Sequence, residues 1–137
     1  MNENETMLRN KIVYLCMADP NSINYMESGI IDKARRIAID YQEEYGCRVI
    51  APYAYLCEIV DYEDKEEMEV VFWFCRKMQV FADAIVVFGD CLSDRMRVEI
   101  DYAWLHGIPI ITRPESFAPV HEYLDSLKRR NEDAGDV

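Results

Sequence analysis

The segment AIVVFGD at residues 84–90, followed by SDRMRVEI at residues 93–100, decides the fold of this 137-residue chain. The first segment is a short apolar, β-rich run closed by Gly-Asp, which is typical of a buried strand. The second predicts a helix with Ser93 as its N-cap, because a hydroxyl there satisfies a backbone N–H that the helix leaves free. In open parallel sheets, a strand, a short polar loop and a capped helix bring backbone N–H groups and the positive helix end to one place. We therefore expect the functional site at this loop.

Strands and helices alternate on both sides of this segment. Strands are predicted at residues 12–17, 48–51 and 108–112, besides the one from residue 84. Helices are predicted at about 24–45, 65–81 and 117–130, besides the one after Ser93, and Gly46 ends the first of them. Successive β-α units predict an α/β fold, namely a single-domain Rossmann- or flavodoxin-like parallel sheet of four to five strands with helices on both faces. The domain is expected to span residues 11–130, between a flexible N-terminus (1–10) and a flexible tail (131–137).

Three loops should meet at the carboxyl edge of this sheet, where such folds bind ligands. They are residues 17–22, 52–64 and 89–96, of which the second is an irregular aromatic and acidic stretch. The candidate ligand-binding residues in these loops are Met17, Asp19, Pro52, Gly89, Ser93, Arg95 and Met96.

Composition excludes several classes of function. The net charge of −11 argues against a nucleic-acid partner, whose binding rests mainly on neutralising phosphates. No window of 18 uninterrupted apolar residues is present, so no membrane span is predicted. The acidic, polar start of the chain is unlike a signal peptide. The five cysteines are odd in number and show no C-x-x-C spacing, which favours reduced core residues of a cytoplasmic protein.

Motifs for common cofactors and nucleophiles are absent from the sequence. It contains no G-x-G-x-x-G, no P-loop and no G-x-S-x-G, so an ordinary dinucleotide, P-loop or serine-hydrolase site is not predicted. His106 and His121 are not spaced to join the cysteines around a metal ion. We expect neither a cofactor nor a metal, which leaves carboxylates, tyrosines and a helix N-terminus as the chemical groups of the site.

Glu99 lies between two apolar faces of its predicted helix. One face carries Met96 and Ile100, and the other carries Val98, Tyr102 and Leu105. A carboxyl group wedged between them is poorly solvated, which favours its protonated form; the alternative is an ordinary solvated residue at the helix edge. The second apolar face predicts either a subunit interface in a homo-oligomer (a dimer or higher) or contact with a neighbouring helix.

The sequence also resembles a known family. Residues 11–16 (KIVYLC), residues 49–52 (VIAP) and ADAIVVFG at 82–89, followed by S-x-x-M-x-x-E-I-x-x-A from Ser93 and G-I-P at 107–109, resemble the nucleoside 2-deoxyribosyltransferase-like proteins. These belong to a wider Rossmannoid group of nucleotide-handling domains that includes lysine-decarboxylase-like and DprA-like proteins. The resemblance covers about residues 11–112.

The resemblance implies a chemistry for Glu99. In the transferases the matching glutamate is the nucleophile that attacks the anomeric carbon of a nucleoside, following the logic of retaining glycosidases. The resemblance further implies an acid that protonates the departing base, for which Asp90 or Asp94 are candidates, and an orienting tyrosine, for which Tyr53 or Tyr14 are candidates. Where the family usually has glycine, this chain has Arg95, which either blocks a close sugar contact or pairs with a phosphate or carboxylate.

Three hypotheses about function follow. In the first, the protein hydrolyses or transfers the N-glycosidic bond of a nucleoside or nucleotide, with Glu99 as nucleophile. In the second, it is a non-catalytic domain that binds a nucleotide-derived small ligand through the Ser93 helix terminus and Arg95. In the third, it is an oligomeric interaction protein in which Glu99 forms a salt bridge with a nearby arginine.

Overall fold

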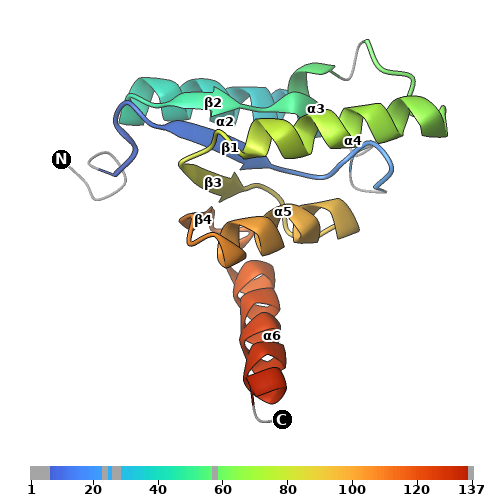
Figure 1. Cartoon of the computed structure of the whole chain (residues 1–137). Helices are drawn as coiled ribbons and strands as arrows, with labels where there is room; N and C mark the ends of the chain where they lie inside the picture. The colour runs from blue at the N-terminus through green and yellow to red at the C-terminus, as the bar shows by residue number, and fades with distance from the viewer. Residues whose placement is uncertain (1–6, 23–24, 26–28, 57–58, 136–137) are drawn as a thin grey trace.

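A computed structural model describes residues 7–22, 25, 29–56 and 59–135 of the chain (Figure 1). Strands and helices alternate along it, in the order β1 (Ile12–Cys16), α2 (Ile30–Tyr45), β2 (Arg48–Ile50), α3 (Pro52–Tyr55), α4 (Lys65–Gln79), β3 (Ala84–Val87), α5 (Asp94–Leu105), β4 (Ile110–Thr112) and α6 (Phe117–Gly135). The predicted α/β fold is therefore confirmed, with four strands in its sheet.

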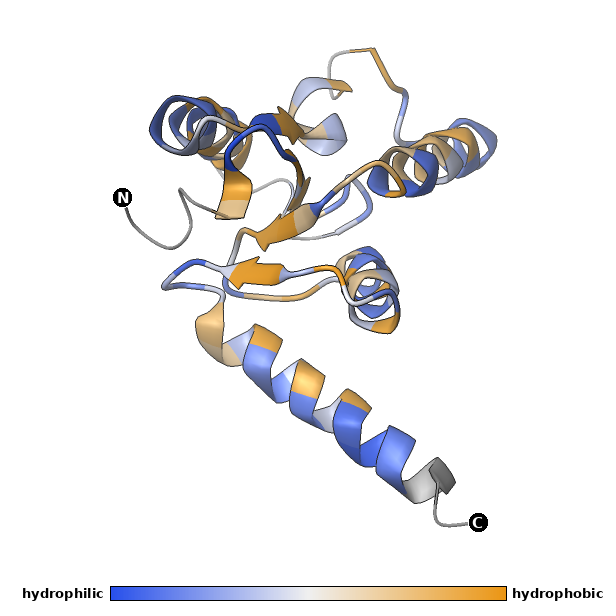
Figure 2. Cartoon of the chain, turned by 60° about the vertical axis from the view of Figure 1, so that its left-hand side comes forward, coloured by the Kyte–Doolittle hydropathy of each residue, from blue (hydrophilic) through white to orange (hydrophobic). Residues whose placement is uncertain are grey.

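The four strands are all parallel and lie in the order β2-β1-β3-β4. Helix α2 lies on one side of the sheet, and α4 and α5 lie on the other (Figure 2). The connection from β1 to β2 runs on one side of the sheet, and the connection from β2 to β3 runs on the other side. The two connections therefore diverge between the neighbouring strands β1 and β3. In open α/β sheets the crevice at the carboxyl ends of such a strand pair is the usual ligand site.

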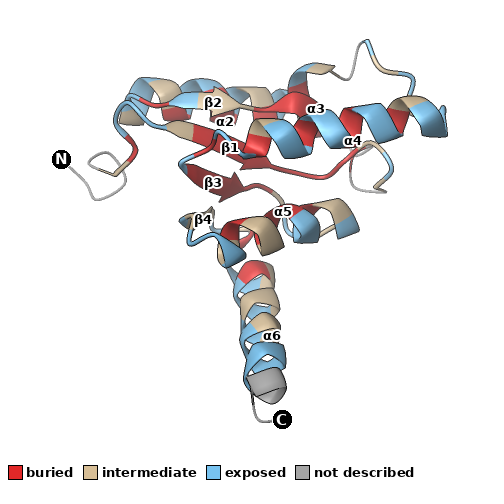
Figure 3. Ribbon diagram, in the orientation of Figure 1, coloured by how far each residue is buried: buried red, intermediate tan, exposed pale blue. Residues whose placement is uncertain are grey.

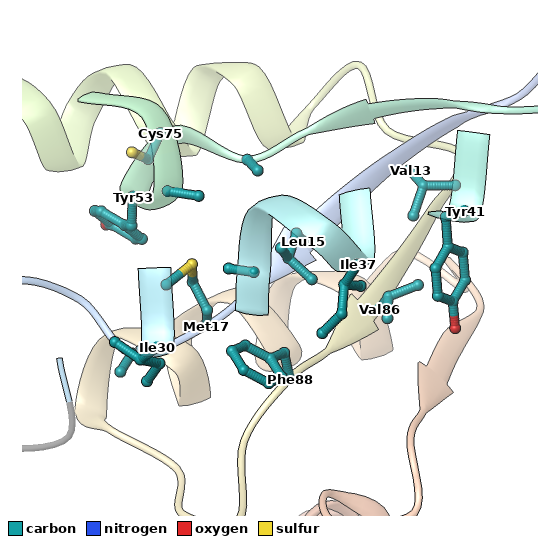
Figure 4. Packing of buried hydrophobic residues seen from close by; sticks show 14 of the residues in the cluster. Val13, Leu15, Met17, Ile30, Ile37, Tyr41, Tyr53, Cys75, Val86 and Phe88 are labelled. Atoms are coloured by element: carbon teal, nitrogen blue, oxygen red, sulfur yellow. The ribbon is translucent and has the colours of Figure 1, made fainter. Parts of the chain in front are cut away.

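Both faces of the two central strands are buried, as expected for parallel strands covered by helices (Figure 3). Val13 and Leu15 pack with Ile37 of α2 in one apolar cluster (Figure 4). Tyr14 and Cys16 point to the other side and pack with residues of α5. The side chain of Asp83 accepts a hydrogen bond of 2.9 Å from the backbone N–H of Ile12, which joins the chain just before β3 to the start of β1.

Most of the predicted signals at element ends are confirmed. Gly46 ends α2 in a left-handed conformation (φ 68°), and its N–H donates to the carbonyl of Gln42. Ser93 is the N-cap of α5, and its hydroxyl accepts a bond of 3.2 Å from the Met96 N–H. Helix α2 begins at Ile30, later than the predicted residue 24, but residues 23–24 and 26–28 lie outside the described part.

Two predicted boundaries are wrong. Residues 52–55, expected to be irregular, form the short helix α3, because Pro52 supplies a fixed φ at the first helical position and lacks only an N–H that the first turn leaves free anyway. Helix α6 continues past the predicted end at residue 130 to Gly135. Its first turns pack against α5, where the Tyr123 hydroxyl donates to the Asp101 carboxylate over 2.5 Å. The rest of α6 then leaves the body of the molecule (Figure 1).

The described cysteines are unpaired: Cys16, Cys47 and Cys75 are buried and Cys91 is exposed, whereas Cys57 lies outside the described residues. No helix in the described part of the chain has the length and apolar character needed to cross a membrane.

Candidate functional site

The Glu99 side chain is buried between α5 and the sheet, with 4% of the residue exposed. Neither oxygen of its carboxyl group has a hydrogen-bond partner among the described residues. Its backbone carbonyl accepts a bond of 2.7 Å from the side-chain amide of Gln79, which joins α5 to α4. A buried carboxylate without a partner is costly, so it is far more often found at functional sites than in ordinary cores.

Burial raises the pKa of Glu99 from its ordinary value of 4.5 to about 8. The nearby Tyr14 hydroxyl opposes this shift, although it does not reach hydrogen-bonding geometry with the carboxyl group. The negative charge of Asp19 raises the pKa further, and the positive charge of Arg95 lowers it. The expectation of a poorly solvated Glu99 therefore agrees with its burial. The third hypothesis, in which Glu99 forms a salt bridge with an arginine, finds no support here, because neither Glu99 oxygen has a hydrogen-bond partner among the described residues.

Two tyrosines and a cysteine surround this carboxyl group. Tyr14 comes from β1 and is fully buried, Tyr53 comes from α3, and Cys75 comes from α4. Tyr53 and Cys75 lie close together at one end of the core (Figure 4). Burial raises the pKa of both tyrosines well above 10 and that of Cys75 to about 11. These groups therefore stay protonated near neutral pH.

A cavity of about 420 Å³ opens where two of the predicted loops meet, and Glu99 is not among the residues that line it. Its lining consists of Asp19, Asn21, Ser22, Phe72, Leu92, Ser93, Asp94 and Arg95. The Arg95 guanidinium lies 3.8 Å from the centroid of the Phe72 ring, a cation–π contact that links α5 to α4. Asp19 and Arg95 both line this cavity and act on the pKa of Glu99, so they connect the cavity to the buried carboxyl group.

The two carboxylates predicted as proton donors lie in different places, Asp94 at the cavity with Arg95 and Asp90 outside it. The Asp94 side chain is fully exposed and forms an ion pair of 3.3 Å with Arg97. Asp90 lies with Gly89 in a different groove of about 810 Å³, formed with α2 and Arg113.

The other predicted ligand residues have different surroundings. Met17, Pro52 and Met96 are buried. Pro52 contributes by starting α3 and thus placing Tyr53. Sequence reasoning missed three residues of α4 at this site, namely Phe72, Cys75 and Gln79. Their i, i+3, i+7 spacing marks them as the inner face of a helix but says nothing about what that face meets.

Among the described residues, no three histidine, cysteine, aspartate or glutamate side chains gather in a way that would hold a metal ion.

Comparisons with known proteins describe the fold and the family. The model of a family described as a domain of unknown function, DUF7768, matches residues 11–113. A comparison with curated proteins gives no match. Among solved structures, the chain is similar to the 2-deoxyribosyltransferase of the psychrotolerant bacterium Bacillus psychrosaccharolyticus, with a TM-score of 0.52 and 20% sequence identity over 74% of this chain and 70% of that one. At this identity the similarity shows a shared fold, which agrees with the resemblance seen in the sequence.

Proposed function

This chain belongs to the DUF7768 family, and we propose that it hydrolyses or transfers the N-glycosidic bond of a nucleoside or nucleotide, with Glu99 as the nucleophile. The observation that supports this function is the buried carboxyl group of Glu99, which has no hydrogen-bond partner among the described residues and is influenced by Asp19 and Arg95 of the cavity lining. The fold shared with a 2-deoxyribosyltransferase is consistent with it.

The proposed reaction has two steps. In the first, a carboxylate oxygen of Glu99 bonds to the anomeric carbon while the bond from that carbon to the base nitrogen breaks. The electron pair of the broken bond leaves with the base, which takes a proton from an acid in the site. In the second, water or another base attacks the anomeric carbon, gives up its proton to the acid that was ionised in the first step, and releases Glu99 as a carboxylate. The low dielectric around Glu99 strengthens its attraction for the positive charge that develops on the sugar.

Asp19 is a further carboxyl group to test in this reaction, together with Asp94, which lines the same cavity. Asp19 is buried, lines the cavity and is close enough to Glu99 for its charge to act on that carboxyl group. Tyr14 is the better placed of the two candidate orienting tyrosines, because its hydroxyl is buried beside Glu99 and has no hydrogen-bond partner among the described residues.

The first test is an incubation of the purified protein with deoxyribonucleosides, ribonucleosides and their 5′-monophosphates, with free bases as acceptors. We expect chromatography to detect released or exchanged base. Glu99→Gln is expected to lower this activity by at least about 1,000-fold, because an amide cannot form the glycosyl ester. Glu43→Gln serves as the control, because Glu43 is exposed on α2 and lines neither cavity, so the rate should stay nearly unchanged. Turnover that persists in Glu99→Gln would rule out this role for Glu99.

A second candidate function is the binding of a nucleotide-derived ligand without turnover. The observation that favours it is that Arg95 and the Ser93 helix terminus both line the cavity, whereas Glu99 does not. Arg95 is then the group that would receive a phosphate or carboxylate of the ligand, by a charge-assisted hydrogen bond next to the positive end of α5.

Arg95→Ala tests this second function by calorimetric titration with nucleoside monophosphates and with the matching nucleosides. We expect affinity for the monophosphates to fall about 10- to 100-fold, since a charged hydrogen bond is lost, while affinity for the nucleosides changes little. Arg97→Ala is the control on the same helix, because Arg97 is exposed and pairs with Asp94. Equal losses for nucleosides and monophosphates would contradict a phosphate contact at Arg95.

A further inference from the structure

Helix α4 is apolar on its outer side as well as on the side that meets the protein. Its inner residues, among them Met68, Val71 and Cys75, are buried. On the outside, Val70 and Trp73 are exposed by 66% and 61% and Phe74 is also exposed, and the exposed Val80 and Phe81 follow directly after the helix. A helix that covers one sheet needs a single apolar face, so the second face has no function within one copy of the chain.

This outer face has the composition of a protein interface. Aromatic side chains are enriched at interfaces and provide most of the contact area there. The exposed parts of these five side chains form an apolar area on the order of 500 Å², which is at the upper end for the largest patch of an ordinary monomer.

The charges on this face are self-complementary. Glu66, Val70, Trp73 and Lys77 are all exposed and follow one another at i, i+4, i+7 and i+11, which places them along one line of the helix. Glu66 stands in the first turn of α4 and Lys77 in the last. The Lys77 ammonium lies 5.7 Å from the centroid of the Trp73 ring, so it is held over the apolar line.

We propose that two copies of this chain form a dimer by packing the outer face of α4 against the same face of the second copy, in antiparallel orientation. A two-fold axis between Val70 and Trp73 places each Val70 against Trp73 of the second copy. The same axis places each Glu66 against Lys77 of the second copy. Such an isologous contact requires a surface that is complementary to itself, which this line of four residues is. A parallel arrangement would place like charges together.

The outer face of α5, which the sequence suggested as an interface, is not complementary to itself. Leu105 is 71% exposed and Val98 is also exposed, but the Tyr102 ring between them stacks on His106 with 4.1 Å between centroids. On α4, the acidic Glu66 and the basic Lys77 lie equally far from the centre of the face, on opposite sides of it. The outer face of α5 has no such pair of opposite charges.

The dimer would also support the Glu99 site. The inner side of α4 carries Phe72, which contacts Arg95, and Gln79, which donates to the Glu99 carbonyl. Fixing α4 from outside therefore fixes one wall of the site. The dimer proposal rests on the α4 surface alone and does not depend on the proposed reaction.

Sedimentation velocity over a concentration series tests the dimer. We expect the wild type to sediment as two copies of the 16.1 kDa chain, and Trp73→Glu to sediment as a monomer. Leu105→Glu is the matched control on α5 and should remain dimeric. Circular dichroism melts should show that both variants stay folded, because both residues are exposed. A wild type that stays monomeric at every concentration up to about millimolar would overturn the proposal. A dimer that Leu105→Glu dissociates and Trp73→Glu does not would also overturn it.

Charge reversal tests the antiparallel register. Glu66→Lys alone and Lys77→Glu alone should each weaken dimerisation about tenfold, since each places two like-charged pairs in the interface. An equimolar mixture of the two single variants should form a heterodimer close to wild-type affinity, because every contact between the copies is again between opposite charges. The double variant Glu66→Lys/Lys77→Glu should likewise restore the homodimer. Failure of both the mixture and the double variant to restore the dimer would contradict this register.

Discussion

Replacing Glu99 with glutamine is expected to stabilise the folded protein at pH 8.5 and to have little effect on stability at pH 4. The folded protein holds the Glu99 proton up to about pH 8, whereas the unfolded chain loses it near pH 4.5. Between these values the folded state binds more protons, so the stability of the wild type falls as the pH rises. Glutamine is never charged and escapes this loss, which amounts to about 3–5 kcal/mol above pH 8.

Denaturant unfolding at several pH values measures this effect. Glu99→Gln and the wild type should unfold at similar denaturant concentrations at pH 4, and the difference should grow steadily towards pH 8.5. At that pH the melting temperature of the variant should be higher by about 10 °C. Glu43→Gln on α2 is the control, because Glu43 is exposed and its replacement should change little. A variant less stable than the wild type at pH 8.5 would mean that the Glu99 carboxylate has a stabilising partner in the folded state.

The second large effect concerns the proposed activity and its pH dependence. A glutamate nucleophile must be ionised to attack, and burial keeps Glu99 protonated until about pH 8. The value of kcat/KM for base release should therefore rise about tenfold per pH unit between pH 6 and pH 8, then level off. The pH range over which the enzyme gains activity is the range over which it loses stability, because both follow the same ionisation.

The pH–rate profile also separates the possible roles of Glu99. Arg95→Ala removes the positive charge that lowers the pKa of Glu99, so the rise should move to higher pH in this variant. Arg97→Ala should leave the profile in place, since Arg97 pairs with the exposed Asp94. A rate that falls above pH 8 would assign Glu99 the role of an acid, and a flat profile from pH 6 to pH 8 would exclude it from the ionisation that limits the rate.

The sequence by itself determined the parts of the fold that local chemistry controls. The strand before Gly89, the helix capped by Ser93 and the glycine end of α2 at Gly46 depend on residues within a few positions of one another. The alternation of strands and helices then leaves few possible topologies, because crossovers between parallel strands are right-handed. The position of Glu99 on α5, between two apolar faces, was also predictable, in this case from helical periodicity.

The tertiary structure alone decided what Glu99 meets. Tyr14, Asp19 and Cys75 reach it from β1, the loop after β1 and α4, which are 24 to 85 residues away in the chain. It also decided that Asp94 lies at the cavity with Arg95, exposed and paired with Arg97, whereas Asp90 lies in the α2 groove. Sequence spacing fixes which residues share a face of one element. The packing of separate elements fixes which faces meet, and the desolvation that raises the pKa of Glu99 exists only after that packing has formed.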